Sequence, residues 1–416
     1  MDDKKKQELL DAFSEKLTNA VRLYMDGCTR CGTCIDSCHA YQSMPETRYT
    51  PVGRAQVVRR LFDKYFKLSG KIAPGMNEAV EFTDEWMQQV LDAAYSCTGC
   101  RRCMTVCPFG IDTQQIQGIA KHLVNTAEMT PVVLNMLADM SIAKAETIED
   151  TRENFAQGVR NLEAEVIEMW KSEAGEEAIP LGVQDANVLY VALAGKHSII
   201  PAAAVMNAAK EKWSLSYFEA VNFGAFAGDP AKTKVIARRI IDEATRLNVK
   251  EVAICECGTA YRVMKYMTGE HPFKVVSVVE LFARYVKEGR IKLDKSKIEG
   301  RVTYHDPCQM ARNGGIYDEP RYLLEQLTDD FVEMTPTREE NWCCGGGGGL
   351  VAMGEKEFRM KSSRVKVDQV KATEAKVLCT ACENCHTQLS DLNEHYDVGV
   401  KVEFLSELLA HALVSE

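Results

Sequence analysis

Two adjacent cysteines, Cys343 and Cys344, run directly into a stretch of five glycines. Two thiolates from neighbouring positions can meet one compact metal cluster, because glycines without Cβ atoms let the backbone curl tightly round it. The N–H groups of Gly345 and Gly346 can then point at the cluster sulfurs. A flexible linker would usually carry serine and lack Trp342, and a phosphate loop would need Gly-Lys-Ser/Thr after the glycines. The stretch therefore predicts a metal cluster, with Gly345 and Gly346 helping to bind it.

Eight further cysteines form two runs of equal spacing, Cys28-x2-Cys31-x2-Cys34-x3-Cys38 and Cys97-x2-Cys100-x2-Cys103-x3-Cys107. This is the spacing of two-cluster ferredoxins, in which the fourth cysteine of each run ligates the other [4Fe–4S] cube. Zinc fits badly, because its sites use separated pairs of thiolates. We expect a first cube on Cys28, Cys31, Cys34 and Cys107, and a second cube on Cys97, Cys100, Cys103 and Cys38. The first run departs from the pattern in one place, with His39 where the second run has Pro108.

The composition indicates a globular protein of two or three domains, with 416 residues of which 46% are hydrophobic. A net charge of −10 argues against nonspecific binding to nucleic acid or anionic lipid. No apolar segment typical of a secretory signal follows the start at Met1, so we expect a reducing cytoplasm, where the sixteen cysteines hold metal rather than form disulfides. No run of 18 apolar residues is present, which predicts no transmembrane segment.

The cysteine runs must be positioned by helices. An apolar stripe marks residues 4–25 as helical, and residues 53–62 and 83–95 between the two runs have the same character. Residues 111–178 are mostly helical and increasingly charged, which suggests a connector. Glycine and proline then punctuate the chain, so we expect a domain boundary between Trp170 and Val183.

Beyond this boundary strands and helices alternate, which implies parallel sheets flanked by helices. The expected strands are Val188–Leu193, a segment near Tyr217–Val221, and Glu251–Ile254. Three helices are expected: one that starts at Pro201, one over 231–247 and one over 279–288. The same alternation begins again at Val302.

The two alternating stretches are related to each other. Lys274–Ala283 matches Lys401–Ala410 position by position, and at the same constant offset Cys255-Glu256 falls on Cys382-Glu383. An internal duplication is therefore expected. The predicted fold class is α+β and multidomain, with a helical dicluster ferredoxin-like N-terminal domain and a duplicated α/β domain with parallel sheets. The expected divisions are 1–130 (ferredoxin-like), 131–178 (connector), 179–296 (first half) and 297–416 (second half).

The two halves differ chemically. The first half keeps only Cys255 and Cys257, and residues 222–229, where paired cysteines would be expected, contain none. The second half carries Cys308, Cys343, Cys344, Cys379, Cys382 and Cys385. We infer that the first half has lost its metal site.

The second half resembles the cysteine-rich CCG module of the B and D subunits of heterodisulfide reductase and of glycolate and glycerol-3-phosphate dehydrogenase iron–sulfur subunits. The resemblance rests on Tyr304-His-Asp-Pro-Cys308, on Cys343-Cys344-Gly345, and on Cys382-x2-Cys385 followed by His386. It implies a noncubane [4Fe–4S] cluster, at which heterodisulfide reductases reduce a disulfide. The implied ligands are Cys308, Cys343, Cys344, Cys382 and Cys385, with Cys379 as an alternative to Cys382.

A single complete module is most similar to the cytoplasmic iron–sulfur subunits of the Dsr and Tmc membrane complexes of sulfate-reducing bacteria. That resemblance implies three kinds of partner: a membrane cytochrome b or quinone-reactive subunit, other redox subunits, and a small protein that carries a persulfide or trisulfide. It also implies a cytoplasmic protein, peripheral on the inner face of the membrane through its partners.

Together these features suggest that two cubes exchange electrons with a noncubane cluster that handles a disulfide or trisulfide substrate. His305, His386 and Cys257 are candidates to supply a proton or approach the substrate. Each also has a structural interpretation: His305 as a loop residue, His386 as a residue that hydrogen-bonds to backbone, and Cys257 as a buried apolar residue. An alternative function is that of a pure electron-transfer subunit for a flavin-dependent dehydrogenase of lactate, glycolate or an electron-transferring flavoprotein. A metal-free scaffold is a third alternative.

Overall fold

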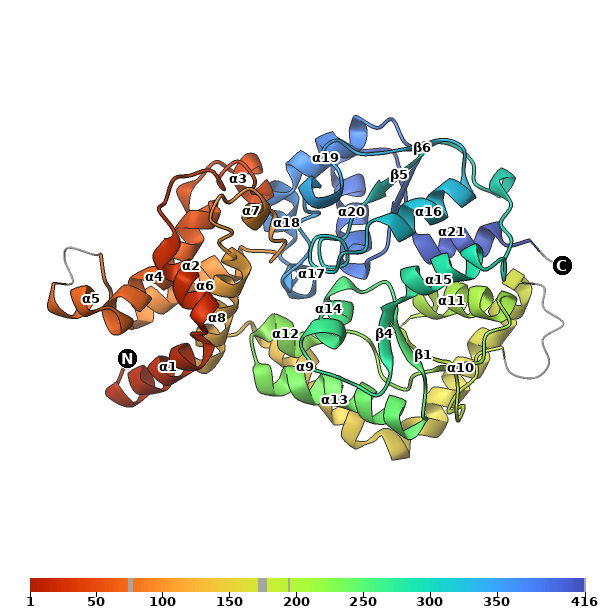
Figure 1. Ribbon diagram of the computed structural model, residues 1–416, viewed down its shortest axis with the longest axis horizontal. Coiled ribbons are helices and arrows are strands. Elements are labelled where there is room, and N and C mark those ends of the chain that lie inside the picture. Colours follow the sequence, from red (N-terminus) through yellow and green to blue (C-terminus); the bar gives the residue numbers. More distant parts are fainter. Residues whose placement is uncertain (74–77, 171–177, 194, 415–416) are drawn as a thin grey trace. The chain divides into compact units, whose positions relative to one another are not determined.

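The computed structural model describes residues 1–73, 78–170, 178–193 and 195–414 (Figure 1). Its contacts divide the chain into two compact units. Unit 1 comprises Met1–Ala138, Phe223–Thr233 and Trp342–Asp368, and unit 2 comprises Asp139–Asn222, Lys234–Asn341 and Gln369–Glu416. The division into four parts stays a prediction. The boundary expected between Trp170 and Val183 falls partly on residues 171–177, outside the described residues.

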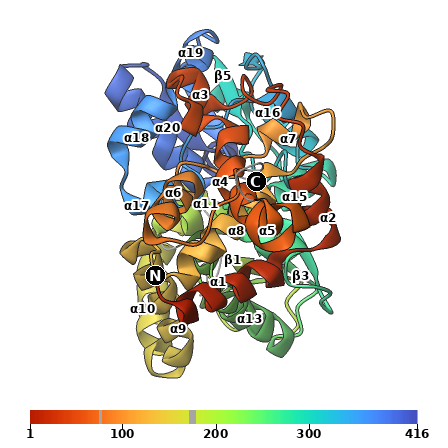
Figure 2. The same cartoon turned by 90° about the vertical axis from the view of Figure 1, so that its left-hand side faces the viewer.

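Unit 1 is helical. Its elements are α1 (Asp3–Lys16), α2 (Asn19–Gly27), α3 (His39–Ser43), η1 (Thr47–Tyr49), α4 (Pro51–Phe66), α5 (Leu68–Ile72), α6 (Asp84–Tyr95), α7 (Arg102–Thr105), α8 (Thr113–Thr126), α12 (Phe223–Ala227), α17 (Leu350–Met353) and α18 (Lys356–Ser362). Three helices cross the unit limits: α9 (Val132–Glu146), α13 (Pro230–Arg246) and α19 (Arg364–Lys371). The helices α1, α4 and α6 pack round α8, whose residues Ile116, Ile119 and Leu123 are buried (Figure 2).

Local sequence fixes where these helices begin. The Thr50 hydroxyl accepts a hydrogen bond from the Gly53 N–H at 2.9 Å, and Pro51 occupies the first turn of α4, where its missing N–H costs nothing. Thr83 caps α6 in the same way. Thr18 caps α2, so the helical stripe expected over 4–25 is two helices rather than one.

Within the described residues, unit 2 contains two four-stranded parallel sheets (Figure 1). The strands are β1 (Val188–Val191), β2 (Trp213–Leu215), β3 (Glu251–Ile254), β4 (Lys274–Ser277), β5 (Val302–His305), β6 (Phe331–Val332), β7 (Val377–Thr380) and β8 (Lys401–Phe404). The sheets are ordered β2-β1-β3-β4 and β6-β5-β7-β8, and their central pairs run in register from Val188↔Glu251 and from Val302↔Val377. The helical elements are α10 (Ile148–Trp170), α11 (Lys196–Ala208), α14 (Gly258–Tyr266), α15 (Val278–Lys287), η3 (Lys295–Lys297), α16 (Asp318–Leu327), η4 (Arg338–Glu340), α20 (Glu383–Tyr396) and α21 (Leu405–Ala412).

The predicted fold class is confirmed, including the duplication. Both sheets have the same strand order, and the first helix of each half, α11 or α16, packs against the last helix of the other half, α21 or α15. The last helices begin alike: Glu280 accepts from the Ser277 N–H at 2.7 Å, and Glu407 accepts from the Phe404 N–H at 3.0 Å. The repeat found in the sequence is thus a repeated strand–helix unit.

One expected strand was wrong. The segment near Tyr217–Val221 was expected to form a strand, but the edge strand β2 is Trp213–Leu215, which pairs with β1 from Val188↔Trp213. Tyr217 and Phe218 are buried without strand pairing. Their apolar character reflects packing in the core rather than a place in the sheet.

Among the described residues, no helix combines the length and the apolar character that crossing a bilayer would require.

Candidate iron–sulfur sites

A cavity in unit 1 is lined by the four cysteines expected to hold the first cube: Cys28, Cys31, Cys34 and Cys107. Cys28 caps the end of α2, and Cys107 follows α7 after a short turn, so two segments far apart in sequence meet here. Cys31 is exposed to solvent, whereas the other three are partly buried. The first cube would therefore lie near the protein surface.

A second cavity in unit 1 is lined by Cys38, Cys97, Cys100 and Cys103, the set expected for the second cube. The buried Arg54 also lines it, and its Nη1 donates to the Cys38 Sγ at 3.4 Å. Burial alone would lower the pKa of Arg54, but the thiolates of Cys38 and Cys97 outweigh burial and raise it. A cation held permanently charged beside thiolates suits an anionic cluster. Cys103 lines the first cavity as well, so the two cavities are neighbours.

The CCG loop, residues 343–349, belongs to unit 1 and packs directly on the second cysteine run. An ideal Cβ built on Gly347 would lie 2.8 Å from the Thr98 carbonyl oxygen, and one on Gly348 would lie 2.6 Å from the Cys97 carbonyl oxygen. Only glycine allows this approach. The Cys343 Sγ lies 3.4 Å from the Thr98 Oγ1 in a hydrogen bond.

The two glycines after Cys344 direct N–H groups at sulfur. The Gly345 N–H donates to the Cys343 Sγ and the Gly346 N–H to the Cys344 Sγ, each at 3.4 Å. These contacts are of the kind that the sequence predicts for Gly345 and Gly346. They place partial positive charge where thiolates would bind a cluster.

Two cations fix the loop further. The buried Lys121 Nζ donates to the Gly348 carbonyl at 2.5 Å, and burial lowers the pKa of Lys121 to about 8. The Arg102 guanidinium lies 3.5 Å from the centroid of the Trp342 ring, and its Nη1 donates to the Ser37 carbonyl at 2.9 Å. The loop is thereby tied to both cysteine runs.

The other three proposed ligands, Cys308, Cys382 and Cys385, lie in unit 2. Cys308 and Cys382 follow the carboxyl ends of the adjacent parallel strands β5 and β7, so both emerge at the same sheet edge. Gly258 packs against both loops: its N–H bonds to Cys382, and a Cβ on it would lie 2.8 Å from the Gln309 Cβ. A hydrogen bond with Cys385 lowers the pKa of Cys382. Depressed thiol pKa values favour the thiolate that binds metal.

Cys379 lies inside β7 and is fully buried, with its Cα paired in register to Tyr304 and Glu403. Burial raises its pKa well above the usual range. Its place in the sheet core contrasts with that of Cys382, which caps α20 beyond the end of the strand.

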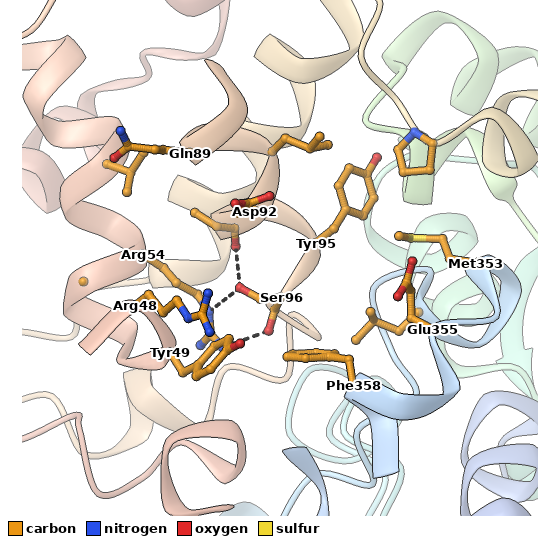
Figure 3. Close-up of a pocket in the computed structure, with 16 residues that line it drawn as sticks. Arg48, Tyr49, Arg54, Gln89, Asp92, Tyr95, Ser96, Met353, Glu355 and Phe358 are labelled. Carbon is orange, nitrogen blue, oxygen red and sulfur yellow. Dashed lines mark hydrogen bonds between the residues drawn. The ribbon is translucent and has the colours of Figure 1, made fainter. Parts of the chain in front are cut away.

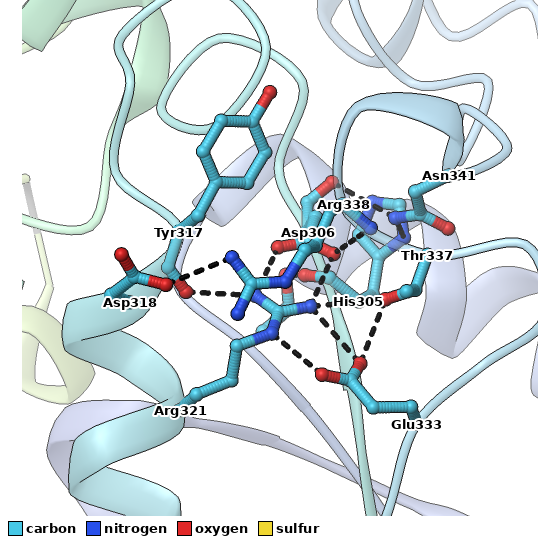
Figure 4. Close-up of polar contacts among 10 residues, drawn as sticks. His305, Asp306, Tyr317, Asp318, Arg321, Glu333, Thr337, Arg338 and Asn341 are labelled. Carbon is cyan, nitrogen blue, oxygen red and sulfur yellow. Dashed lines mark hydrogen bonds and ion pairs between the residues drawn. The ribbon is translucent and has the colours of Figure 1, made fainter.

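An ion-pair network holds the loop that carries Cys308 (Figure 4). Arg321 donates to both carboxylate oxygens of Asp306 at 2.6 and 2.8 Å, and to those of Glu333 at 2.6 and 3.0 Å. The Arg338 N–H also donates to Asp306, at 3.0 Å. Buried charges of this kind stay in place only with partners of good geometry. The network therefore positions the Cys308 loop against α16 and the segment before the CCG loop.

The three candidate proton donors have distinct surroundings. His305 is buried in β5, and its Nδ1 lies 3.2 Å from the Asn341 Nδ2 in a hydrogen bond (Figure 4). His386 stacks on Phe404 at 4.2 Å, and its Nε2 bonds to the Val402 carbonyl at 3.2 Å. Cys257 caps α14, and burial, together with the charge of Cys382, raises its pKa to about 12.

Some residues of the sites escaped the sequence analysis. The sequence patterns did not single out Arg321, and they did not predict the contact between His197 and Glu383. The His197 Nε2 lies 2.8 Å from the Glu383 Oε2, and this hydrogen bond raises the pKa of His197. The internal repeat, which aligns Glu256 with Glu383, was the available signal. Glu256 is buried and accepts from the Leu405 N–H at 3.0 Å.

Unit 1 also contains a pocket of about 730 Å³ beside the second cube cavity (Figure 3). The rings of Tyr49, Tyr95 and Phe358 face it, and Arg54 lines both the pocket and the cysteine cavity. Arg54 is held there by Ser96, whose Oγ and carbonyl accept from it at 3.0 and 2.8 Å. The Arg54 side chain thus forms a shared wall between this pocket and the second cysteine cavity.

Comparison with known proteins identifies two domains. Residues 24–111 match a 4Fe-4S dicluster domain, and residues 302–390 match the cysteine-rich CCG domain. The chain is thus an iron–sulfur protein that joins these two modules, and the dicluster domain implies two [4Fe–4S] clusters.

Similarity extends over almost the whole chain. An Hdr-like menaquinol oxidoreductase iron–sulfur subunit 2 from Archaeoglobus fulgidus is 26% identical, over 98% of this chain and 83% of the relative. The D subunit of the dihydromethanophenazine:CoB–CoM heterodisulfide reductase of Methanosarcina mazei is 28% identical, over 96% of this chain and 97% of the relative. An EtfAB:quinone oxidoreductase of Syntrophomonas wolfei is 24% identical, over 89% of this chain and 55% of the relative.

The protein is therefore a CCG-domain iron–sulfur protein similar to the D subunit of heterodisulfide reductase and related to Hdr-like menaquinol oxidoreductase subunits. The predicted kinship with heterodisulfide reductase-like oxidoreductases is confirmed. The narrower resemblance to the Dsr and Tmc subunits stays a prediction.

Proposed function

We propose that this protein carries single electrons through its two cubes to or from a third, noncubane [4Fe–4S] centre, at which a disulfide or trisulfide substrate is handled. The overall reaction joins one disulfide, two electrons and two protons to give two thiols. Cubes transfer one electron at a time, so the third centre must receive two in succession.

The contact between the CCG loop and the second cysteine run carries this proposal. Cys343 bonds to Thr98, which lies between Cys97 and Cys100, and Gly347 and Gly348 touch the backbone of the same run. All these residues belong to unit 1. One ligand of the third centre thus adjoins the ligands of the second cube, which a chain of redox centres requires.

The first cube is the proposed port for the external partner. Cys31, a proposed ligand of the first cube, is exposed, whereas Cys343, a proposed ligand of the third centre, is buried. Exposure of a cluster edge shortens the path to a docked carrier. We therefore order the centres as partner, first cube, second cube and third centre, with either direction of flow.

The third centre would be held by Cys308, Cys343, Cys344, Cys382 and Cys385. Cys382 is preferred to Cys379 because it lies beyond the strand end with a lowered thiol pKa. When bound, a noncubane [4Fe–4S] cluster supplies the electrons that open a sulfur–sulfur bond. The chain's own residues fix the thiolates, and Gly345 and Gly346 donate backbone hydrogen bonds to two of them.

Cys257, His305 and His386 remain the proposed proton donors or substrate-contacting residues. Among these three residues Cys257 is the favoured candidate, because the charge of the proposed ligand Cys382 acts on its thiol. The ring of His386 is engaged with the Val402 carbonyl, an arrangement that suits a supporting role.

We further propose that the protein works as the cytoplasmic subunit of a complex whose membrane partner is a cytochrome b or quinone-reactive subunit. The name of the A. fulgidus relative, a menaquinol oxidoreductase subunit, supports this proposal. A small persulfide- or trisulfide-bearing protein is the proposed soluble partner. The four-part domain division is part of the same proposal.

The iron and acid-labile sulfide of anaerobically purified protein test the cofactors. About twelve irons per chain are expected from three four-iron centres, and a value near eight would leave the third centre without support. A value near zero would reject the whole scheme.

Titration with a trisulfide or heterodisulfide then tests the substrate. A new paramagnetic signal and turnover with a reduced electron donor are expected, and the C343S variant serves as control because it keeps both cubes' ligands. The similarity to an EtfAB:quinone oxidoreductase favours one competitor, an electron-transfer subunit of a flavin-dependent dehydrogenase. Twelve irons without any response to sulfur substrates would favour that competitor.

A further inference from the structure

His39 occupies the position directly after Cys38, where the second run has Pro108 after Cys107. It begins the short helix α3, with Cys38 as the capping residue, and its side chain is buried, at 3% exposure. A buried histidine beside a cysteine ligand needs a physical explanation, because desolvating an imidazole is costly unless its nitrogens find partners.

Two cysteine sulfurs lie close to this ring. A ring nitrogen of His39, the Cys100 Sγ and the Cys343 Sγ all lie within 4.8 Å of one another. His39 also lines the cavity formed by Cys38, Cys97, Cys100 and Cys103. All of these residues belong to unit 1, so the imidazole stands where the second cube's ligands meet the CCG loop.

The Nδ1 atom of His39 is buried and has no hydrogen-bond partner among the described residues. Leaving such a group unsatisfied is costly, because water no longer hydrogen-bonds to it. Thiolate and sulfide sulfurs of a cluster are acceptors, and a neutral imidazole carries one N–H donor. A cluster in this cavity would therefore provide the acceptor that the ring lacks.

We propose that His39 tunes the second cube by donating an N–H hydrogen bond to a sulfur of that cube or of its ligand Cys100, on the side that faces Cys343. Reduction adds a negative charge to a cube, and a hydrogen bond to its sulfur stabilises that charge, so the reduction potential rises. Proline has no side-chain donor, and the first cube has Pro108 at the matching position. The hydrogen bond therefore raises the potential of the second cube, which favours its reduction. His39 acts as a positioning residue, since it acts on the substrate only through the cluster.

This inference rests on the proposed assignment of the two cubes. Its test compares H39L, which removes the donor at similar volume, with H39Q, which keeps an N–H donor, and with P108H, which adds one at the equivalent position of the first cube. Anaerobic redox titration followed by electron paramagnetic resonance measures each cube's midpoint potential. Iron analysis of every sample accompanies it.

In H39L we expect the equilibrium constant for reduction of the second cube to fall about tenfold, which is about 59 mV for one electron. The first cube should keep its potential, and H39Q should restore most of the shift. P108H should instead raise the potential of the first cube. Unchanged potentials in H39L, or equal shifts in H39L and H39Q, would overturn the proposal.

The wild-type protein provides a measurement that depends on no substitution. After selective ¹⁵N-histidine labelling, pulsed paramagnetic resonance should detect a ¹⁵N coupling on the reduced second cube and none on the first, and its absence would overturn the tuning role even if H39L failed to retain its clusters. An iron content below that of two cubes in the wild-type protein would instead contradict the proposed function.

Discussion

Replacing Gly348 by alanine perturbs the contact between the CCG loop and the second cysteine run. Gly348 has φ +69°, in the left-handed region, where a side chain costs about 1–2 kcal/mol. The added Cβ would also lie 2.6 Å from the Cys97 carbonyl oxygen and 3.2 Å from the Thr98 Cα. Forcing an extra methyl group into packed surroundings costs about 1–3 kcal/mol more. The total destabilisation of G348A is therefore about 2–5 kcal/mol.

Gly354 offers a matched control. Its φ is +72°, nearly that of Gly348, but a Cβ built on it meets no atom within 4 Å. G354A should therefore show only the backbone cost of about 1–2 kcal/mol. The difference between the two variants isolates the collision with the cysteine run, about 1–3 kcal/mol.

Anaerobic urea unfolding of both variants, followed through cluster absorbance, measures these costs under identical conditions. We expect G348A to lose its clusters at a lower urea concentration than G354A, and to alter the paramagnetic signal of the second cube, which G354A leaves unchanged. Equal midpoints for the two variants would refute the close contact between Gly348 and Cys97, and with it the proposed junction of the second and third centres.

Two further predictions concern unit 2. R321L should destabilise the protein by about 3–5 kcal/mol in urea unfolding, since it leaves the buried Asp306 carboxylate without its ion-pair partner. The control R301A removes a half-exposed ion pair with Asp330 and should cost less than about 1 kcal/mol. Equal losses of stability in the two variants would contradict a positioning role for Arg321. Burial raises the pKa of Glu256 to about 8, so the folded state holds a proton that the unfolded chain releases above its ordinary pKa near 4.5. The free energy of unfolding should therefore fall as pH rises from 6 to 8, by up to about 1.4 kcal/mol per pH unit from this group, and E256Q should remove that part of the slope; a slope unchanged in E256Q would show that Glu256 is ionised in the folded state.

Local patterns in the sequence predicted much of the fold. The strand Glu251–Ile254 was predicted with its observed limits, and the helix expected over 231–247 is α13, Pro230–Arg246. Both depend on neighbouring residues, through alternation, amphipathic spacing and flanking polar positions. The edge strand β2 was misplaced because its position depends on pairing with β1, and both Trp213–Leu215 and Tyr217–Val221 are apolar enough to be buried.

The cysteine spacing predicts which thiols share a cube, since the crossing of the fourth ligand is a property of the motif. Each set of four cysteines lines one cavity, and the ligand assignment stays a prediction. The side chains that contact these cysteines in the fold could not be predicted from the sequence. That His39 lies beside Cys343 depends on a contact between segments from opposite ends of the sequence, and nothing near either residue encodes it. The role of Arg321 in holding Asp306 likewise became visible only in three dimensions.

The path of the chain through its two units has a consequence for biogenesis. Unit 1 is complete only once Trp342–Asp368 has been made, long after Ala138 leaves the ribosome. At ordinary rates of translation the synthesis of the intervening chain lasts roughly 10 to 40 seconds. Throughout this interval, Cys97 and Thr98 lack the CCG loop, whose Gly347 and Gly348 later pack against them. We expect the nascent chain to receive the second cube during this interval, before the loop closes over its ligands.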